Sequence, residues 1–260
     1  MSRHILLSLE FDGTDFAGWQ RQDGQRTVQA CLEAALDQLL GEPPARLRAS
    51  SRLDAGVHAR GLPVMVTTDR DLPLVAFERG LNSLLPADLA VTAAVESHAD
   101  FDVRRSAIGK EYRYTYWNRR ARSPLRARTS WHAPWALDLE AMRAAAPALL
   151  GEHDFQTFRA AGCEAHTTIR RLSQLRIEAS GQGEIVLVVV GNAFLQHMVR
   201  IIAGSLFEVG RRRHPPDWLG EALAARDRAA AGQTAPARGL TLWEVLYPQS
   251  PWPAPATENR

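Results

Sequence analysis

The stretch Arg52-Leu53-Asp54-Ala55-Gly56-Val57-His58 brings a cation, a carboxylate and an imidazole together within seven residues. Gly56 allows the backbone to bend between them, and the apolar run that follows at 62–67 is typical of a β-strand. The sequence therefore predicts a turn at the edge of a sheet, where polar side chains can converge on a ligand. An aspartate is ordinarily ionised at neutral pH, so it needs no base to act as a nucleophile. The same residues also suit an ordinary surface turn, with Arg52 as the solvated partner of Asp54.

Hydrophobic periodicity on both sides of this turn predicts a ferredoxin-like unit. Alternating apolar residues indicate strands, and an apolar stripe at helical spacing follows Thr27, a good N-cap. The expected elements are strands at 5–11, 45–50, 62–68 and 89–95, and helices that begin at Thr27 and Pro73. The order βαββαβ is that of the ferredoxin-like fold.

The same order recurs in the second part of the chain, with one extra helix. The expected elements are a strand at 110–118, a helix capped by Asp138, a hairpin of strands at 168–179 and 184–190, a helix at 193–209, a helix from about Pro215, and a strand at 240–247. We therefore predict an α+β protein with one half at 1–108 and another at 109–248. The proline-rich tail at 249–260 is expected to be disordered.

Composition places the chain among soluble globular proteins, with 45% apolar and 23% charged residues in 260. A net charge of +2 hides a basic run at 104–128, which holds nine cations against one acid, Glu111. Tyrosines and a tryptophan are interleaved with these cations. Such a run suits a polyanion with stackable bases, although a solvated charged segment has the same composition.

Neither a metal site nor a membrane segment is expected. Cys31 and Cys163 lie far apart, and no Cys or His spacing supplies the converging ligands that would make His58 or His153 a zinc ligand. The apolar run at the start is too short for a signal peptide, and no stretch approaches the ~20 apolar residues of a membrane helix. We expect a soluble, cytoplasmic protein.

The turn at Arg52 resembles the signature Arg-Thr-Asp-Ala-Gly-Val-His of the tRNA pseudouridine synthase A family. Leu53 stands in the place of Thr, and Ser51 stands where a glycine usually precedes the arginine. Six further segments resemble motifs of that family, in the same order along the chain. They are Phe11-Asp12-Gly13-Thr14 with Gly18-Trp19-Gln20-Arg21-Gln22, Thr27-Val28-Gln29, Phe101-Asp102-Val103-Arg104, Lys110-Glu111-Tyr112-Arg113-Tyr114, His153-Asp154-Phe155 through Arg159, and Asn192 through Arg200.

The resemblance implies a fold, a substrate and a mode of action. The two ferredoxin-like halves would carry mainly antiparallel sheets joined over a central cleft. The protein would be a homodimer without a cofactor. It would isomerise uridine to pseudouridine on the 3′ side of the tRNA anticodon stem-loop, at tRNA positions 38–40.

Catalytic roles also follow from the resemblance. Asp54 would be the catalytic carboxylate; it could add to C6 of the base, attack C1′ or help to remove the 2′ proton, and the sequence does not choose among these. Tyr112 would stack on the target base, although core packing is the alternative. Arg52 would hold phosphate and fill the place of the flipped base. Arg200 lies in an apolar stretch and would need a partner, which we expect to be Asp54 in a buried ion pair.

Substrate contacts are expected from Arg52, Arg113, Arg119 and Arg120. His58 is expected either to contact the RNA through a hydrogen bond or to make a structural hydrogen bond. Three other functions compete with this one. The chain could be a pseudouridine synthase with another RNA target, or a non-catalytic RNA-binding protein. Against the second, a carboxylate such as Asp54 repels phosphate and adds nothing to passive binding. A metal-dependent hydrolase would be inhibited by chelators.

Overall fold

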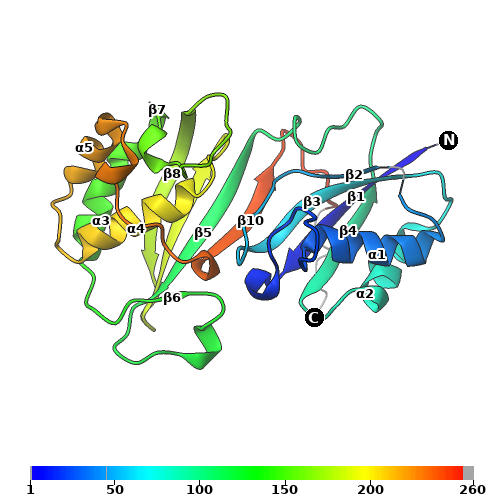
Figure 1. Cartoon of the computed structure of the whole chain (residues 1–260), viewed down its shortest axis with the longest axis horizontal. Coiled ribbons are helices and arrows are strands. Elements are labelled where there is room, and N and C mark those ends of the chain that lie inside the picture. The colour runs from blue at the N-terminus through cyan, green and yellow to red at the C-terminus, as the bar shows by residue number, and fades with distance from the viewer. Residues whose placement is uncertain (1, 45, 254–260) are drawn as a thin grey trace.

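The computed structural model describes residues 2–44 and 46–253, and it confirms the α+β class (Figure 1). The first half contains the expected βαββαβ order, and its strands pair antiparallel in the order β4-β1-β3, with β2 on the other side of β3. Its elements are β1 (Arg3–Phe11), α1 (Val28–Leu40), β2 (Arg46–Ala49), β3 (His58–Thr68), the π-helical η2 (Ala76–Gly80), α2 (Leu81–Leu84) and β4 (Leu89–Glu96).

The second half repeats this arrangement, because its strands pair antiparallel in the order β10-β5-β9-β8. Two short strands were not expected: β7 extends the sheet beyond β8, and β6 pairs parallel to β5. The elements are β5 (Gly109–Trp117), β6 (Trp131–His132), α3 (Leu139–Ala145), β7 (Gly151–Asp154), β8 (Ile169–Ala179), β9 (Glu184–Gly191), α4 (Met198–Gly210), α5 (Trp218–Ala225) and β10 (Leu240–Leu246). Short 3₁₀ helices lie at Gly13–Asp15, Pro124–Arg126, Ala146–Leu149, Gln156–Phe158, Arg228–Ala230 and Ala237–Gly239.

The two halves share one sheet because β10 pairs with the start of β3. This pairing is parallel and consists of two residue pairs, Thr241 with His58 and Leu242 with Ala59. The short strand β2 occupies the same edge of β3 further along, where Ala49 pairs with Val64. The turn at 50–57 therefore leaves the sheet at the place where β2 ends and β10 becomes the neighbour of β3.

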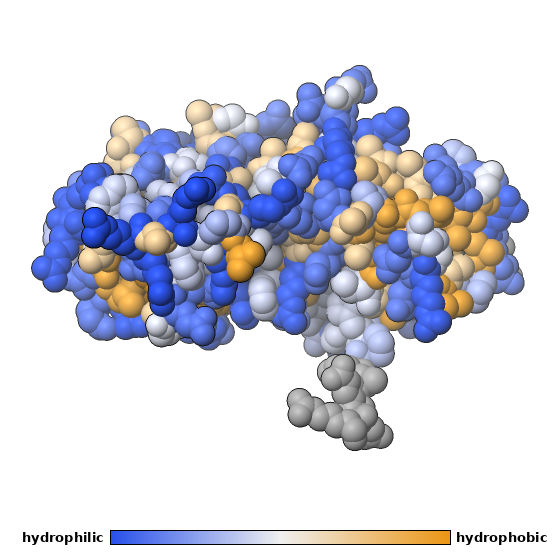
Figure 2. All heavy atoms as spheres, turned by 90° about the horizontal axis from the view of Figure 1, so that it is seen from below, coloured by the Kyte–Doolittle hydropathy of each residue, from blue (hydrophilic) through white to orange (hydrophobic). Residues whose placement is uncertain are grey.

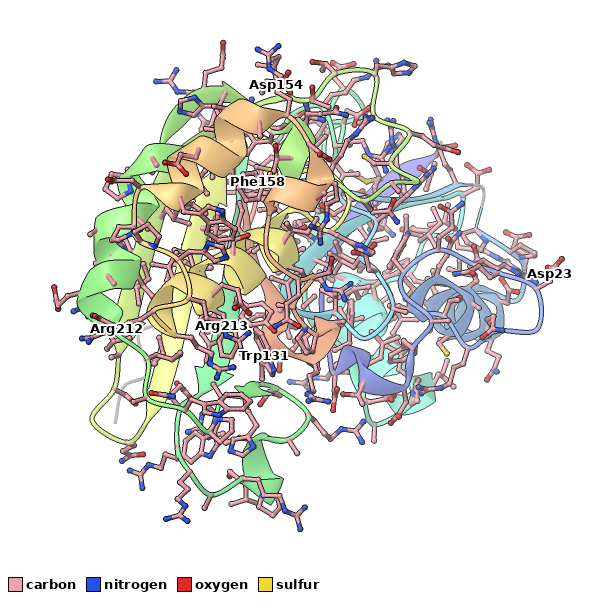
Figure 3. All side chains as sticks on the ribbon, turned by 60° about the vertical axis from the view of Figure 1, so that its left-hand side comes forward. Asp23, Trp131, Asp154, Phe158, Arg212 and Arg213 are labelled. Carbon is pink, nitrogen blue, oxygen red and sulfur yellow. The ribbon has the colours of Figure 1, made fainter. Side chains whose placement is uncertain are left out.

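One hydrophobic core runs through both halves on the face of the sheet that the helices cover. Ile5 and Leu7 of β1 pack in this core with Leu36 of α1, and all three are fully buried. In the second half, the hydroxyl of Tyr116 donates to the carbonyl of Ala203 in α4 at 2.8 Å. Phe158, also fully buried, lies inside the half that α3, α4 and α5 cover (Figure 3).

Two of the predicted helix starts are confirmed, and one is wrong. The Thr27 hydroxyl accepts from the Ala30 amide, and the Asp138 carboxylate accepts from the Ala141 amide, as N-caps do. The helix expected from residue 193 begins only at Met198, because His197 adopts a left-handed conformation with φ 62°. Before it, the chain makes side-chain and loop hydrogen bonds, such as the Asn192 oxygen accepting from the Ala193 amide, that compete with a helix.

The structure describes residues 249–253 of the tail that is expected to be disordered, and one of these residues lies against the sheet. Trp252 packs against a second small cluster, formed by Leu6, Met65 and Val103 on the sheet face opposite the main core. Residues 254–260 lie outside the described part. Within 2–44 and 46–253, no helix has both the length and the apolar character that a membrane span needs.

Gly204 of α4 gives a test of this packing. A Cβ atom at Gly204 would overlap the carbonyl oxygen of Gln233, so Gly204→Ala should lower the free energy of unfolding by about 1–3 kcal/mol or more. Gly220 of α5 is the matched control, since its Cβ would lie 3.5 Å from Ala148, an ordinary contact. Gly220→Ala should be neutral or stabilise by up to about 1 kcal/mol. Urea denaturation measures both, and equal effects of the two changes would contradict the packing of α4 described above.

Candidate active site

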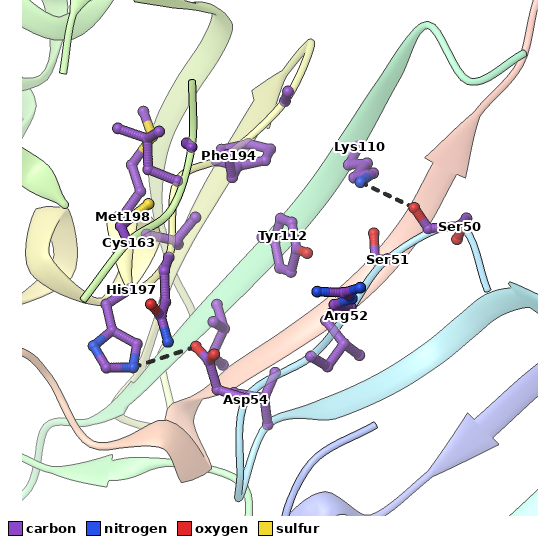
Figure 4. Close-up of a pocket in the computed structure, with 18 of the residues that line it drawn as sticks. Ser50, Ser51, Arg52, Asp54, Lys110, Tyr112, Cys163, Phe194, His197 and Met198 are labelled. Carbon is purple, nitrogen blue, oxygen red and sulfur yellow. Dashed lines mark hydrogen bonds and ion pairs between the residues drawn. The ribbon is translucent and has the colours of Figure 1, made fainter. Parts of the chain in front are cut away.

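A cleft of about 880 Å³ lies between the two halves, on the helix-bearing face. Figure 1 shows α3, α4 and α5 over one half and α1 and α2 over the other, with β5 and β10 between them. Tyr112 of β5 and Leu240 of β10 line the cleft where these strands pass beneath it. One wall is the turn at 50–57, and the other combines the segments 162–166 and 192–199 (Figure 4). Both halves therefore contribute side chains to the same site.

The turn at 50–57 is held in place by its apolar residues and by backbone contacts. Leu53 and Val57 are buried in the core, and the Leu53 carbonyl accepts from the Trp19 amide at 3.0 Å. Gly56 has φ 77°, a conformation that side chains other than glycine rarely adopt. Because its neighbours are anchored on both sides, Asp54 is presented to the cleft from a fixed backbone, with 31% of its side chain exposed.

His197 contacts Asp54 across the cleft. Its Nε2 atom lies 3.5 Å from Oδ2 of Asp54, and the two residues come from different halves (Figure 4). Burial lowers the pKa of His197, while the negative charge of Asp54 opposes that shift and Arg200 adds to it. The sequence reasoning gave His197 no role. The one signal that could have found it is an imidazole directly before a strongly apolar helix.

The predicted buried ion pair between Asp54 and Arg200 is wrong. In the described part of the chain, Arg200 makes no ion pair within 4.0 Å with Asp54, and its Nε donates instead to the Ala235 carbonyl at 2.8 Å. The late start of α4 places Arg200 in the first turn of the helix, half-buried, with His197 nearer to the carboxylate. Burial lowers the pKa of Arg200, and the charge of Asp54 works against that shift.

Tyr112 lies on the cleft floor with 7% of its surface exposed. Its ring meets Phe194 edge to face, with the centroids 5.0 Å apart. Burial raises the pKa of Tyr112, so the phenol keeps its proton at neutral pH and remains a hydrogen-bond donor. Tyr114 and Tyr116 instead donate to the carbonyls of Pro236 and Ala203, inside the protein. Of these three tyrosines, only Tyr112 lines the cleft.

The structure does not bring His58 and Arg113 into the cleft. His58 is 4% exposed; its Nδ1 accepts from the Gly13 amide at 3.0 Å, and its Nε2 lies 3.1 Å from the Arg238 carbonyl. Arg113 follows Tyr112 on β5 and therefore faces the opposite side of the sheet, where its guanidinium stacks 3.7 Å from the ring centre of Trp243. Both side chains therefore contact other parts of the protein, and for His58 this agrees with the structural alternative.

The basic run at 104–128 is divided among several places. Arg104 and Lys110 line the cleft together with Arg52, and a groove containing Arg46 and Arg48 adjoins it. Arg119, Arg120 and Arg122 are exposed on the loop between β5 and β6, whereas Arg126 and Arg128 pair with Glu184, Asp12 and Asp15. Seen from below, the half that carries this loop is mainly hydrophilic (Figure 2). The run is therefore not one continuous surface.

The family model described as tRNA pseudouridine synthase matches residues 8–104 and 145–248. The chain belongs to this family. The tRNA pseudouridine synthase A of Myxococcus xanthus is 49% identical over 249 residues, which cover 95% of this chain and 93% of that relative. The protein of the same name from Geobacter sulfurreducens is 50% identical over 246 residues, with coverages of 94% and 100%.

A solved structure, the Cbf5-Nop10-Gar1 complex, includes a chain with 11% identity and a TM-score of 0.36, over 91% of this chain and 57% of that chain. That likeness is too weak to bear on the fold.

Within the described residues, no three His, Cys, Asp or Glu side chains come together as metal ligands.

The structural role of His58 can be tested directly. His58→Ala would leave the Gly13 amide and the Arg238 carbonyl buried without their partner, which should lower the free energy of unfolding by at least about 1–3 kcal/mol. The matched control is His98→Ala, because His98 is exposed and its loss should change stability by no more than about 0.5 kcal/mol. Thermal or urea unfolding measures both. If His58→Ala had normal stability and bound tRNA poorly, His58 would be a substrate contact and not a structural residue.

Proposed function

We propose that Asp54 is the catalytic carboxylate of a reaction that converts uridine to pseudouridine in tRNA. The family makes the protein an isomerase that acts on tRNA. The observation that supports Asp54 is its position: a carboxylate on an anchored turn, in a cleft between two halves, beside an aromatic floor. A passive RNA-binding surface gains nothing from a carboxylate there, since it repels phosphate.

The reaction is a rearrangement within one nucleotide. The bond from C1′ to N1 breaks, the base turns, a bond from C1′ to C5 forms, C5 loses a proton and N1 gains one. No electrons are gained or lost overall, and no second substrate is consumed. Asp54 serves as nucleophile or base in this sequence, with attack at C6, attack at C1′ and removal of the 2′ proton as the three possible first steps.

The target uracil has to leave its stack to reach Asp54, at a cost of a few kcal/mol. The cleft, at about 880 Å³, has the size of a small-molecule site and can receive a single nucleotide. Tyr112 offers a ring and a protonated hydroxyl on the floor. Arg52 is exposed at the rim, where it lines both the cleft and the adjoining groove, a position suited to fill the place of the flipped base and to hold phosphate.

The substrate position and the quaternary state belong to the same proposal. The target uridines lie on the 3′ side of the anticodon stem-loop, the protein acts as a homodimer, and Arg119 and Arg120 contact tRNA from the exposed loop between β5 and β6. Support comes from the family resemblance and from the exposure of these arginines. A pseudouridine synthase with another RNA target would share the cleft and differ in this outer surface. Sedimentation of the free protein and of its tRNA complex tests the dimer.

Asp54→Asn preserves shape and removes the charge that nucleophilic attack or proton removal needs. We expect pseudouridine formation to fall by at least about 10³-fold, while the tRNA Kd stays within about threefold of the unmodified protein. Asp23→Asn, on an exposed loop, is the matched control and should leave both values unchanged. Mapping pseudouridine in tRNA transcripts, without added cofactor, measures activity and locates the target. Appreciable turnover by Asp54→Asn would show that Asp54 is not the catalytic carboxylate.

His197 is assigned as a positioning residue for Asp54. His197→Leu should lower kcat by about 10- to 100-fold with little change in KM, because a small displacement of the carboxylate is enough to slow the reaction. His197→Gln keeps an N–H donor near Oδ2 and should recover part of the loss. The two variants are matched, since Leu and Gln tolerate the left-handed backbone at this position equally poorly. Equal kcat values in the two variants would show that the contact with Asp54 has no role.

A further inference from the structure

The cleft has a second polar end, away from Asp54, formed by Ser50, Ser51, Lys110 and Arg104. Ser50 and Ser51 are 1% and 5% exposed. In the described part of the chain the Ser50 hydroxyl has no hydrogen-bond partner, and the Ser51 hydroxyl lies near the phenol of Tyr112, whose pKa it lowers, without the geometry of an ordinary hydrogen bond. A buried hydroxyl without a partner costs stability, so the Ser50 hydroxyl, next to a Ser51 hydroxyl that is at best weakly bonded, calls for an explanation. Both residues line the cleft, where a bound molecule could satisfy them (Figure 4).

Lys110 adds a positive charge to these hydroxyls. It is the only lysine in a chain whose other cationic side chains are arginines, and it is half-buried. Its Nζ atom donates to the Ser50 carbonyl at 3.4 Å, and within the described residues it takes part in no ion pair. Burial and the nearby charge of Arg104 lower the pKa of Lys110 to about 8.

The charge at this end of the cleft is unbalanced. Arg104 and Arg52 line the same space. Burial, then repulsion from Arg52 and Arg48, lowers the pKa of Arg104, and the nearby carboxylate of Asp102 only partly opposes that shift. The acids that line the cleft are Asp54 at the other end and Glu164 on the opposite wall. An ammonium group, a guanidinium group and two hydroxyl donors together form a site for an anion with several oxygens.

We propose that Lys110, Arg104 and the hydroxyls of Ser50 and Ser51 bind one backbone phosphate of the RNA strand, next to the target uridine. This inference rests on the proposed function and specifies how the same cleft holds its substrate. Lys110 and Tyr112 point to the same face of β5 and stand about 7 Å apart, which matches the distance from a base to its neighbouring phosphate. A uracil carbonyl could satisfy the hydroxyls, but it would leave the ammonium charge without a counter-ion.

The proposal predicts a change in the titration of Lys110. A bound phosphate favours the charged amine and raises its pKa, so by linkage the affinity for tRNA is highest below pH 8 and falls as the pH rises through it. The other charged or titratable side chains that line the cleft are Arg52, Arg104 and Tyr112 on this side, Cys163, Glu164 and His166 on the opposite wall, and Asp54 and His197 at the other end. The arginines keep their charge in this range.

The single lysine makes this titration directly observable. Reductive methylation of the full-length protein with ¹³C-formaldehyde keeps the charge and gives one ε-dimethyl NMR signal besides that of the α-amino group. We expect the apparent pKa of this signal to rise by about one unit or more when tRNA is bound. An unchanged pKa in the tRNA complex would overturn the proposal, and this experiment needs no variant that could fail to fold.

A second experiment identifies the phosphate. Full-length tRNA is ligated from synthetic pieces, with one linkage near the target uridine replaced by an uncharged methylphosphonate, and its Kd is measured with Asp54→Asn protein. At one linkage the methylphosphonate should weaken binding about tenfold. Lys110→Met should weaken binding of unmodified tRNA by a similar factor, and the methylphosphonate at that linkage should not weaken binding to this variant any further. Arg176→Met, on the exposed strand β8, is the matched control. The methylphosphonate should weaken tRNA binding to this variant as much as it weakens binding to the protein without the change.

The outcomes separate this proposal from the proposed function. If the losses of tRNA affinity caused by Lys110→Met and by the methylphosphonate multiply at every linkage tested, the phosphate site is overturned. The proposed function would still stand in that case, provided that the unmodified protein binds and modifies tRNA. A protein that neither bound nor modified tRNA would overturn both. Coupling at a single linkage, together with the rise in pKa, supports the site.

Discussion

The parallel pairing of β10 with the start of β3 is the constraint on which the site depends. Only two residue pairs form it, yet they join the sheets of both halves into one. They are available because β2 has four residues and covers only the later part of β3. The turn at 50–57 is consequently held at the seam, opposite the loop that precedes α4. A longer β2 would cover the start of β3 and remove the pairing of β10 with β3, leaving β10 paired only with β5.

This seam brings together groups that neither half could assemble. The carboxylate of Asp54 comes from the first half, and the imidazole of His197 and the ring of Tyr112 come from the second. The cleft opens between the helices of the two halves, and its ends differ in charge. The carboxylate lies beside the aromatic floor at one end, whereas cations and the buried hydroxyls of Ser50 and Ser51 gather at the other around Lys110. A nucleotide has the same division, with an uncharged base and a charged phosphate.

Local physics was enough to predict much of this from the sequence. Alternation along strands identified most of the sheet, and the N-caps Thr27 and Asp138 identified two helix starts, because caps act on neighbouring amides. The ferredoxin-like order in both halves followed from the sequence of elements, and the resemblance of Arg52 through His58 to a known signature indicated the family and the candidate carboxylate.

The sequence by itself determined the elements, the family and Asp54 as the candidate carboxylate, whereas contacts between distant residues were decided by the tertiary structure. Periodicity continued the last long helix back to residue 193, but loop hydrogen bonds and the left-handed His197 delayed its start, so His197 and not Arg200 contacts Asp54. Strand pairing buried His58 behind the turn, and the pleat turned Arg113 away from the cleft. Spacing along the chain reports neighbours within a turn or a strand, while the approach of two charges depends on how whole elements pack.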